Sequence, residues 1–154
     1  GAQPLGAVAA RTAVYDTITE AGPAAGIEFF HGYTYSAHPA CAAAALAMLD
    51  IFRRERLVER AAALAPYFID ALFSLADLPA VVDIRAIGLL GAIEVAPAGA
   101  PGARGYALQN RLFDAGLSLK TTGDNLLVAP PLISERAHVD AIVARLREAL
   151  AAVA

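Results

Sequence analysis

The chain has 154 residues, of which 58% are hydrophobic and 18% are charged. This length is enough for one domain with a buried core, and the composition excludes an intrinsically disordered chain. The formal net charge is −3, with 12 basic and 15 acidic side chains, which excludes the clustered basic surface that nucleic-acid binding requires. The longest apolar run, Ala40 to Leu49, is too short to cross a bilayer. The single cysteine, Cys41, has no partner for an internal disulfide and predicts a reducing compartment such as the cytoplasm.

The first predicted elements are a strand of small residues and a short helix. Residues 1–10 are mostly small and apolar, and we expect a strand there. Val14 and Ile18 are four positions apart, which predicts a helix from Arg11 to Ile18. The glycines and the proline of residues 22–26 predict a turn that ends this helix.

A polar aromatic loop, His31–Pro39, leads directly into an Ala-rich helix. Gly32 allows a close backbone approach, Thr34 and Ser36 offer hydroxyl groups, and Pro39 suits the first position of a helix. The start of a helix supplies free N–H groups and positive dipole, so this loop has the composition of a ligand contact. For an arbitrary loop of this composition, packing against its own domain is the commoner explanation.

Two helices are predicted after the loop. The first runs from Pro39 to about Arg54 and is expected to place Leu46 and Leu49 toward a core. The second runs from about Arg56 to Ala76, and Pro66 within it predicts a kink or a restart of the helix. Apolar residues recur along the second helix at helical spacing, which predicts one packed face: Leu57, Ala61, Leu64, Phe68, Leu72 and Leu75.

The remainder alternates short strands with two helices. One helix is predicted from about Ala103 to Ala115 with Gly116 as a left-handed cap, and the last helix has Ser134 as its predicted N-cap. The predicted strands are Val81–Ile84, Leu89–Val95, Leu117–Lys120 and Asn125–Val128. Leu89–Val95 is almost wholly apolar, so we expect it to be covered on both faces. The pattern predicts an α/β domain of the α+β kind, with a small, mostly antiparallel sheet and helices on one face.

Two other kinds of site are poorly supported. His31, His38 and His138 lack a cysteine or carboxylate at ligand spacing, so no metal site is predicted. Ser36 beside a histidine suggests a hydrolase pair, but no nucleophile elbow surrounds it.

The loop and the first residues resemble one family. Phe30–Pro39, which reads FHGYTYSAHP and precedes an Ala-rich helix, resembles a segment of class III, pyridoxal-phosphate-dependent aminotransferases. With Ala37, it most resembles the omega-amino-acid, or beta-alanine:pyruvate, branch. Gly1–Val8 resembles the family segment that follows the Schiff-base lysine within about one turn. The resemblance covers essentially the whole chain, which corresponds to about the last third of the family's length.

The resemblance implies a fold type I transferase. Residues 1–37 would be the tail of the large pyridoxal-phosphate-binding domain, and residues 38–154 the small C-terminal domain. Tyr33 and Thr34 would contact the cofactor phosphate across the interface of a homodimer. The Schiff-base lysine is not in this chain, so no catalytic residue is predicted in it, and the chain alone is expected to be inactive.

Eleven of the twelve basic residues are arginines, and Lys120 is the only lysine. In the family, its position matches an arginine that binds the substrate carboxylate and can swing aside, not the lysine that forms an imine with the cofactor. One hypothesis is therefore the C-terminal portion of an omega-amino-acid:pyruvate aminotransferase, with pyridoxal 5'-phosphate as cofactor and an amino donor and a keto acid such as pyruvate as substrates. Its partner would be a second subunit or the missing N-terminal part of the same protein. The other hypothesis is a non-catalytic truncated or dimerising module, and a lysine about one turn before Gly1 would separate the two.

Overall fold

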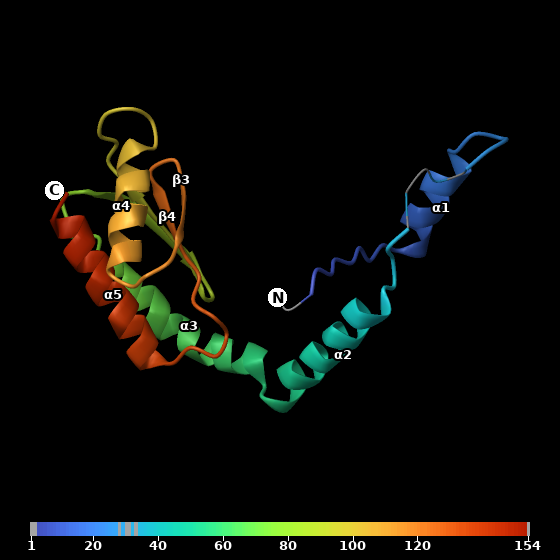
Figure 1. The fold of residues 1–154 in the computed structure, drawn as a ribbon, viewed down its shortest axis with the longest axis horizontal. Coiled ribbons are helices and arrows are strands. Elements are labelled where there is room, and N and C mark those ends of the chain that lie inside the picture. The colour runs from blue at the N-terminus through green and yellow to red at the C-terminus, as the bar shows by residue number, and fades with distance from the viewer. Residues whose placement is uncertain (1–2, 28, 30–31, 33, 154) are drawn as a thin grey trace. The chain divides into compact units, whose positions relative to one another are not determined.

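The computed structural model describes residues 3–27, 29, 32 and 34–153 (Figure 1). The chain forms two compact units, Gly1–Arg54 and Glu55–Ala154, and each is described by itself. The predicted boundary between residues 37 and 38 concerns the domains of a complete enzyme and stays a prediction. Among the described helices, none combines the length and the apolar character needed to cross a bilayer.

The first unit contains helices α1, Thr12–Glu20, and α2, Pro39–Arg54. Both predicted helices are confirmed, and α2 begins at Pro39 as expected. The strand expected near the start is not formed, since residues 3–10 have no strand partner in the described chain. Leu46 and Leu49 are 66% and 51% exposed, so the expectation that they face a core is wrong within this structure. Their apolar spacing is real, but no described side chain of the unit buries them.

The second unit contains helices α3, Leu57–Phe73, α4, Ala103–Asp114, and α5, Arg136–Ala151. Helix α3 continues through Pro66 as one helix, so the predicted restart does not occur. Phe68 and Leu72 lie within the next two turns of α3 and are fully buried. Burial of two large side chains contributes about 3–6 kcal/mol, which offsets the lost hydrogen bond. Most of the predicted stripe of α3 is in the core, to which the strand Lys120–Thr122 contributes no buried residue. Helices α4 and α5 and the other three strands contribute Ile84, Ile93, Val95, Leu108, Leu112, Leu126, Val128, Val139, Leu146 and Leu150.

The second unit is built on a four-stranded antiparallel sheet with the order β1-β2-β4-β3. The strands are β1, Val81–Ile87, β2, Leu90–Val95, β3, Lys120–Thr122, and β4, Asn125–Val128. Strand β1 is longer than predicted because Arg85–Ile87 pair with β2 and only Gly88, with φ of +57°, and Leu89 form the turn. Strand β3 begins at Lys120 rather than at Leu117.

The two faces of the sheet differ in what covers them. Ile84, Ile93 and Leu126 are buried in one core with residues of α3, α4 and α5. The helices therefore cover one face of the sheet, as predicted (Figure 1). Alternate residues point the other way, and Leu90 on that open face is 53% exposed. The expectation that the strand now seen as β2 is covered on both faces is therefore wrong for this structure.

The helix ends are set by local hydrogen bonds. Glu135, not Ser134, is the N-cap of α5, where the backbone N–H of Glu135 donates to Nδ1 of His138 over 3.0 Å. Gly116 follows α4 with φ of +81°, as predicted for a left-handed cap.

Helices α3 and α5 are also joined by side chains. The Tyr67 hydroxyl donates a hydrogen bond to Asp140, and the guanidinium of Arg136 lies 4.8 Å from the centre of the Tyr67 ring. These contacts connect the exposed sides of two helices whose inner faces already share the core.

Candidate functional site

The aromatic loop ends in a turn, Thr34–Ala37, immediately before α2. Ala37 has φ of +56°, in the left-handed region that a residue with a Cβ rarely adopts. The carbonyl of His38 then accepts the N–H of Ala42 over 2.9 Å, which is the first turn of helical bonding. The N–H groups at the start of such a helix have no partner within it. The hydroxyl groups of the turn are therefore close in sequence to the unpaired N–H groups at the start of α2.

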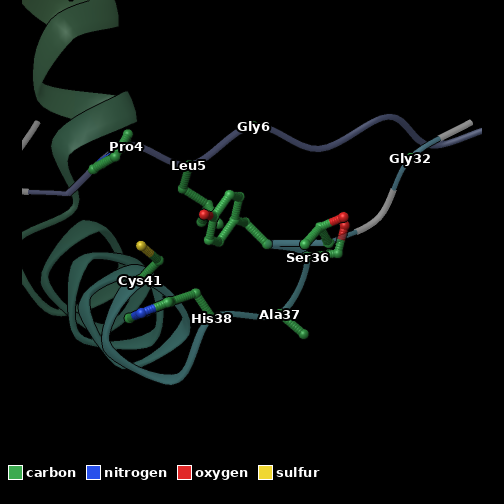
Figure 2. A pocket seen from close by; sticks show the side chains of 10 residues that line it. Pro4, Leu5, Gly6, Gly32, Ser36, Ala37, His38 and Cys41 are labelled. Carbon is green, nitrogen blue, oxygen red and sulfur yellow. The ribbon is translucent and has the colours of Figure 1, made fainter.

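This turn lines a cavity of about 620 Å³ within the first unit. Pro4, Leu5 and Gly6 form one side of it, and the turn and the start of α2 form the other. Figure 2 shows His38 and Cys41 on the helix side of the cavity and Ser36 and Ala37 on the loop side. The lining residues of the turn and the helix start are Gly32, Thr34, Tyr35, Ser36, Ala37, His38 and Cys41.

The donors in this cavity suit a phosphate group. Thr34, Tyr35 and Ser36 are exposed and bring three hydroxyl groups, and hydroxyl donors bind phosphate oxygens with charge-assisted hydrogen bonds. Gly6 has no heavy atom within 4 Å of where a Cβ would stand, which leaves room beside the loop. Among the described residues that line the cavity there is no lysine or arginine, and the basic side chain present is that of His38. Tyr33, the other predicted cofactor contact, lies outside the described residues.

Lys120, the predicted substrate contact, is the first residue of β3 and is exposed. It pairs with Leu127 of β4, and alternation places Lys120, Leu127 and Leu90 on the open face of the sheet. No carboxylate of the described chain lies within ion-pair distance of Lys120, whereas arginines such as Arg85 and Arg147 do form ion pairs. The ammonium is therefore not neutralised by a neighbour and is available to an anion.

A cavity of about 380 Å³ lies beside Lys120 in the second unit. Its other walls are almost entirely apolar. They come from β2, β4, α5 and the segments before β3 and after β4: Leu90, Leu117, Ser118, Leu119, Leu127, Val128, Ala129, Pro130, Pro131 and Ile142. An apolar wall next to one cation lowers the local dielectric and strengthens the attraction of that cation for an anion. This arrangement can hold a small molecule that has a carboxylate and a short carbon chain.

The sequence analysis did not find the polar cluster on the same open face. Arg85 donates to Glu94 over 2.9 Å, to Asp83 over 2.5 Å and to the side-chain oxygen of Asn125 over 2.8 Å. The hydrogen bonds to Glu94 and Asp83 raise the pKa of Arg85, so it stays charged. The four residues come from three strands, and only the register of the sheet brings them together.

The weaker alternatives gain no support from the geometry. The described chain contains no group of three or more possible metal ligands. His138 is engaged in the cap of α5, and His31 lies outside the described residues. Ser36 and His38 line the same cavity, but no hydrogen bond of the described structure joins them. Thr34 and Lys120 belong to different units, each with its own cavity.

Sequence comparison supports one family throughout. The family described as "Aminotransferase class-III" matches residues 1–150. The chain is 48% identical to an omega-aminotransferase of Caulobacter vibrioides over 97% of the chain and 34% of that protein. It is 42% identical to a beta-alanine–pyruvate aminotransferase of Pseudomonas aeruginosa over 100% of the chain and 35% of that protein. The chain thus spans about a third of the length of the curated relatives it matches.

Solved structures agree with the sequence matches. A thermostable omega transaminase from Pseudomonas jessenii, a six-fold mutant, has a TM-score of 0.76 and 34% identity over 82% of this chain and 30% of that one. The omega transaminase of the same organism in complex with PMP has a TM-score of 0.73 and 36% identity over 79% of this chain and 28% of that one. These likenesses confirm the expected fold of a pyridoxal-phosphate-dependent transferase, with its small antiparallel sheet and its helices. The chain belongs to the class III aminotransferases.

Proposed function

We propose that this chain is the C-terminal part of an omega-amino-acid:pyruvate aminotransferase of the cytoplasm. The observation that carries the proposal is the family match over residues 1–150, since it includes both cavities described above. The complete enzyme works as a homodimer with pyridoxal 5'-phosphate as its cofactor. Its amino donor is an omega-amino acid such as beta-alanine, and its acceptor is pyruvate.

The turn at Thr34 contributes to binding of the cofactor phosphate. Thr34, with Tyr33 beside it in the sequence, would hold the cofactor phosphate across the subunit interface, and the Thr34 hydroxyl would serve as a hydrogen-bond donor. The described lining of this cavity contains no lysine or arginine, so the charge of the phosphate is balanced mainly by the other subunit. Pyridoxal phosphate, when bound, supplies the electron-accepting ring that an amino-group transfer requires.

Lys120 binds the carboxylate of the donor or the acceptor. Its ammonium is a compact point charge and offers no planar fork, so it attracts a carboxylate but orients it less strictly than a guanidinium does. The apolar residues around it, Leu90 and Leu127 among them, exclude water from the bound carbon chain. An enzyme with this lysine therefore tolerates amines without a carboxylate comparatively well.

The chain does not contain the lysine that forms the Schiff base with the cofactor. Lys120 is the only lysine, and it is assigned to the substrate. Activity therefore requires the preceding part of the family's polypeptide, which carries the Schiff-base lysine. The chain by itself has the phosphate contact and the carboxylate contact only.

A hybrid enzyme tests this proposal. The matched segment of the Caulobacter vibrioides omega-aminotransferase is replaced by this chain, and formation of alanine from pyruvate is measured with beta-alanine as donor. We expect an active hybrid from which Thr34→Ala releases cofactor more easily, by about tenfold in dissociation constant, because one hydrogen bond to a charged group is lost. Thr34→Ser keeps the hydroxyl and is expected to keep the affinity.

Thr19→Ala is the matched control, since the Thr19 hydroxyl bonds only the backbone of its own helix. A folded hybrid that binds cofactor but gives no alanine would favour the non-catalytic module. Unchanged cofactor affinity of Thr34→Ala, together with a large loss of thermal stability, would make Thr34 a structural cap of α2.

A further inference from the structure

Strand β3, which carries Lys120, is short and lies at an edge of the sheet. It is a three-residue edge strand that pairs only with β4. The turn between β3 and β4 contains Gly123 with φ of +58° and the half-buried Asp124. A short edge strand of this kind opens easily unless side chains fix it. The position of the Lys120 side chain therefore depends on contacts that other elements make with this hairpin.

Asp124 connects this turn to the first turn of α4. One oxygen of its carboxylate accepts the N–H of Gly105 over 2.9 Å, and the other accepts the N–H of Gly102 over 3.1 Å. Gly102 is the N-cap of α4 and has no side chain to cap the helix itself. Asp124 therefore acts as the cap from about 20 residues away, with its negative charge at the positive end of the helix dipole.

The backbones of the turn and the helix are in close contact. A Cβ on Gly105 would stand 2.1 Å from the carbonyl oxygen of Gly123 and 3.1 Å from the Cα of Asp124. A Cβ on Gly102 would stand 3.3 Å from the Cα of Gly123. Two glycines thus allow the approach that the carboxylate of Asp124 then fixes.

Two further hydrogen bonds hold the same hairpin. The hydroxyl of Thr121, next to Lys120, donates to the side chain of Gln109 in α4 over 2.6 Å. On the open face, Arg85 donates to Asn125 of β4. The hairpin is therefore held on its helix side by α4 and on its open side by β1.

We propose that Asp124 is a positioning residue that acts through Lys120. By capping α4, its carboxylate fixes the β3–β4 turn and so determines where the Lys120 ammonium stands beside its apolar cavity. The proposal rests on the proposed carboxylate-binding role of Lys120. Gln109 contributes a second, weaker hold through Thr121.

The single lysine allows a direct test on the chain itself. Reductive methylation with ¹³C-formaldehyde labels Lys120 and the chain's N-terminal amine, and Lys120→Arg identifies which NMR signal is which. The dimethyl ammonium stays charged and cannot form an imine, so a shift of its signal with pyruvate reports binding alone. Acetone, which lacks the carboxylate, is the matched control ligand. Hydrogen exchange of the amides of β3 is measured in parallel.

For Asp124→Ala we expect a changed and more mobile Lys120 signal, amide exchange in β3 faster by about tenfold, and an apparent pyruvate affinity lower by about threefold or more. Asp124→Asn keeps one acceptor and is expected to restore most of the protection, because asparagine caps helices about as well as aspartate. Asp77→Asn is the control variant, since it removes a carboxylate of the same unit that pairs with Arg147.

The proposal would be overturned if Asp124→Ala showed the same Lys120 signal and the same rate of β3 amide exchange as the control variant Asp77→Asn. If Asp124→Ala does not fold, Gln109→Ala takes its place, and we expect smaller changes of the same kind in the Lys120 signal and in the β3 amide exchange. An unchanged Lys120 signal in Gln109→Ala would also overturn the proposal. If pyruvate moves the Lys120 signal in no variant while β3 still responds to Asp124→Ala, the carboxylate site fails and the positioning role stands.

Discussion

Gly105→Ala is the substitution whose cost the structure defines most sharply. Gly105 is the third residue of α4, with no side chain and its backbone N–H bonded to Asp124. In an unobstructed helix, this change stabilises by up to about 1 kcal/mol, because alanine is the better helix former. Here the new Cβ would stand 2.1 Å from the Gly123 carbonyl oxygen, which must recede by at least about 1.3 Å to reach ordinary contact.

Such a movement stretches both hydrogen bonds of Asp124 beyond useful length. Hydrogen bonds to a charged group contribute about 1.5–3 kcal/mol each, and the lower end applies because Asp124 is only partly buried. After subtracting the gain in helix propensity, we expect a net loss of about 2 kcal/mol. In a unit of this size, that corresponds to a fall in Tm of roughly 8–16 °C.

Urea unfolding followed by circular dichroism measures the loss, and hydrogen exchange at the fully buried Leu108 and Leu112 assigns it to α4. The double variant Gly105→Ala with Asp124→Ala is the control. If both act through the same two hydrogen bonds, it should be little less stable than Gly105→Ala alone. A Gly105→Ala protein as stable as the parent, or two fully additive losses, would refute the reasoning.

Three other results are expected. In the hybrid enzyme, we compare kcat/KM for a donor that has a carboxylate with kcat/KM for a similar donor that lacks one. Lys120→Arg should raise this ratio by roughly tenfold, because the planar guanidinium adds a second hydrogen bond to the carboxylate. An unchanged ratio would mean that Lys120 is only a solvated residue at the end of a strand. The hydrogen bond to Asp140 raises the pKa of Tyr67, so its contribution to stability is complete below the ordinary value near 10 and is lost as the pH rises through the folded-state value. Tyr67→Phe should therefore lose stability at pH 8 and show a smaller decline above pH 10 in urea unfolding, and equal declines would contradict this. The isolated chain mixed with pyridoxal phosphate should keep no cofactor absorbance after dialysis, and a retained band that Lys120→Ala abolishes would show that the lysine is misassigned.

The sequence predicted those features that depend on neighbours along the chain. Pro39 and the alanines after it define the start of α2, and the buried Phe68 and Leu72 of α3 follow from helical spacing. The position of Lys120 in a strand was also predicted, although the strand begins later than expected.

What the sequence did not predict depends on pairing between distant segments. The cap of α4 comes from Asp124, and no local pattern identifies a capping residue on another element. The Arg85 cluster requires the register of three strands. The exposure of Leu46 and Leu49 could not be read from their spacing, because an apolar stripe gives the direction of a contact and not its partner.

The strand order also bears on solubility. Strands β1 and β3 are the two edges of the described sheet, and an unpaired edge is a template for another chain. Strand β3 has only three residues and starts with a lysine, and β1 carries Asp83 and Arg85 on its open face. Short length and charge are the features that discourage edge-to-edge association. An apolar residue at position 120 would therefore remove the proposed carboxylate contact and, in the same step, make the edge of the sheet prone to aggregation.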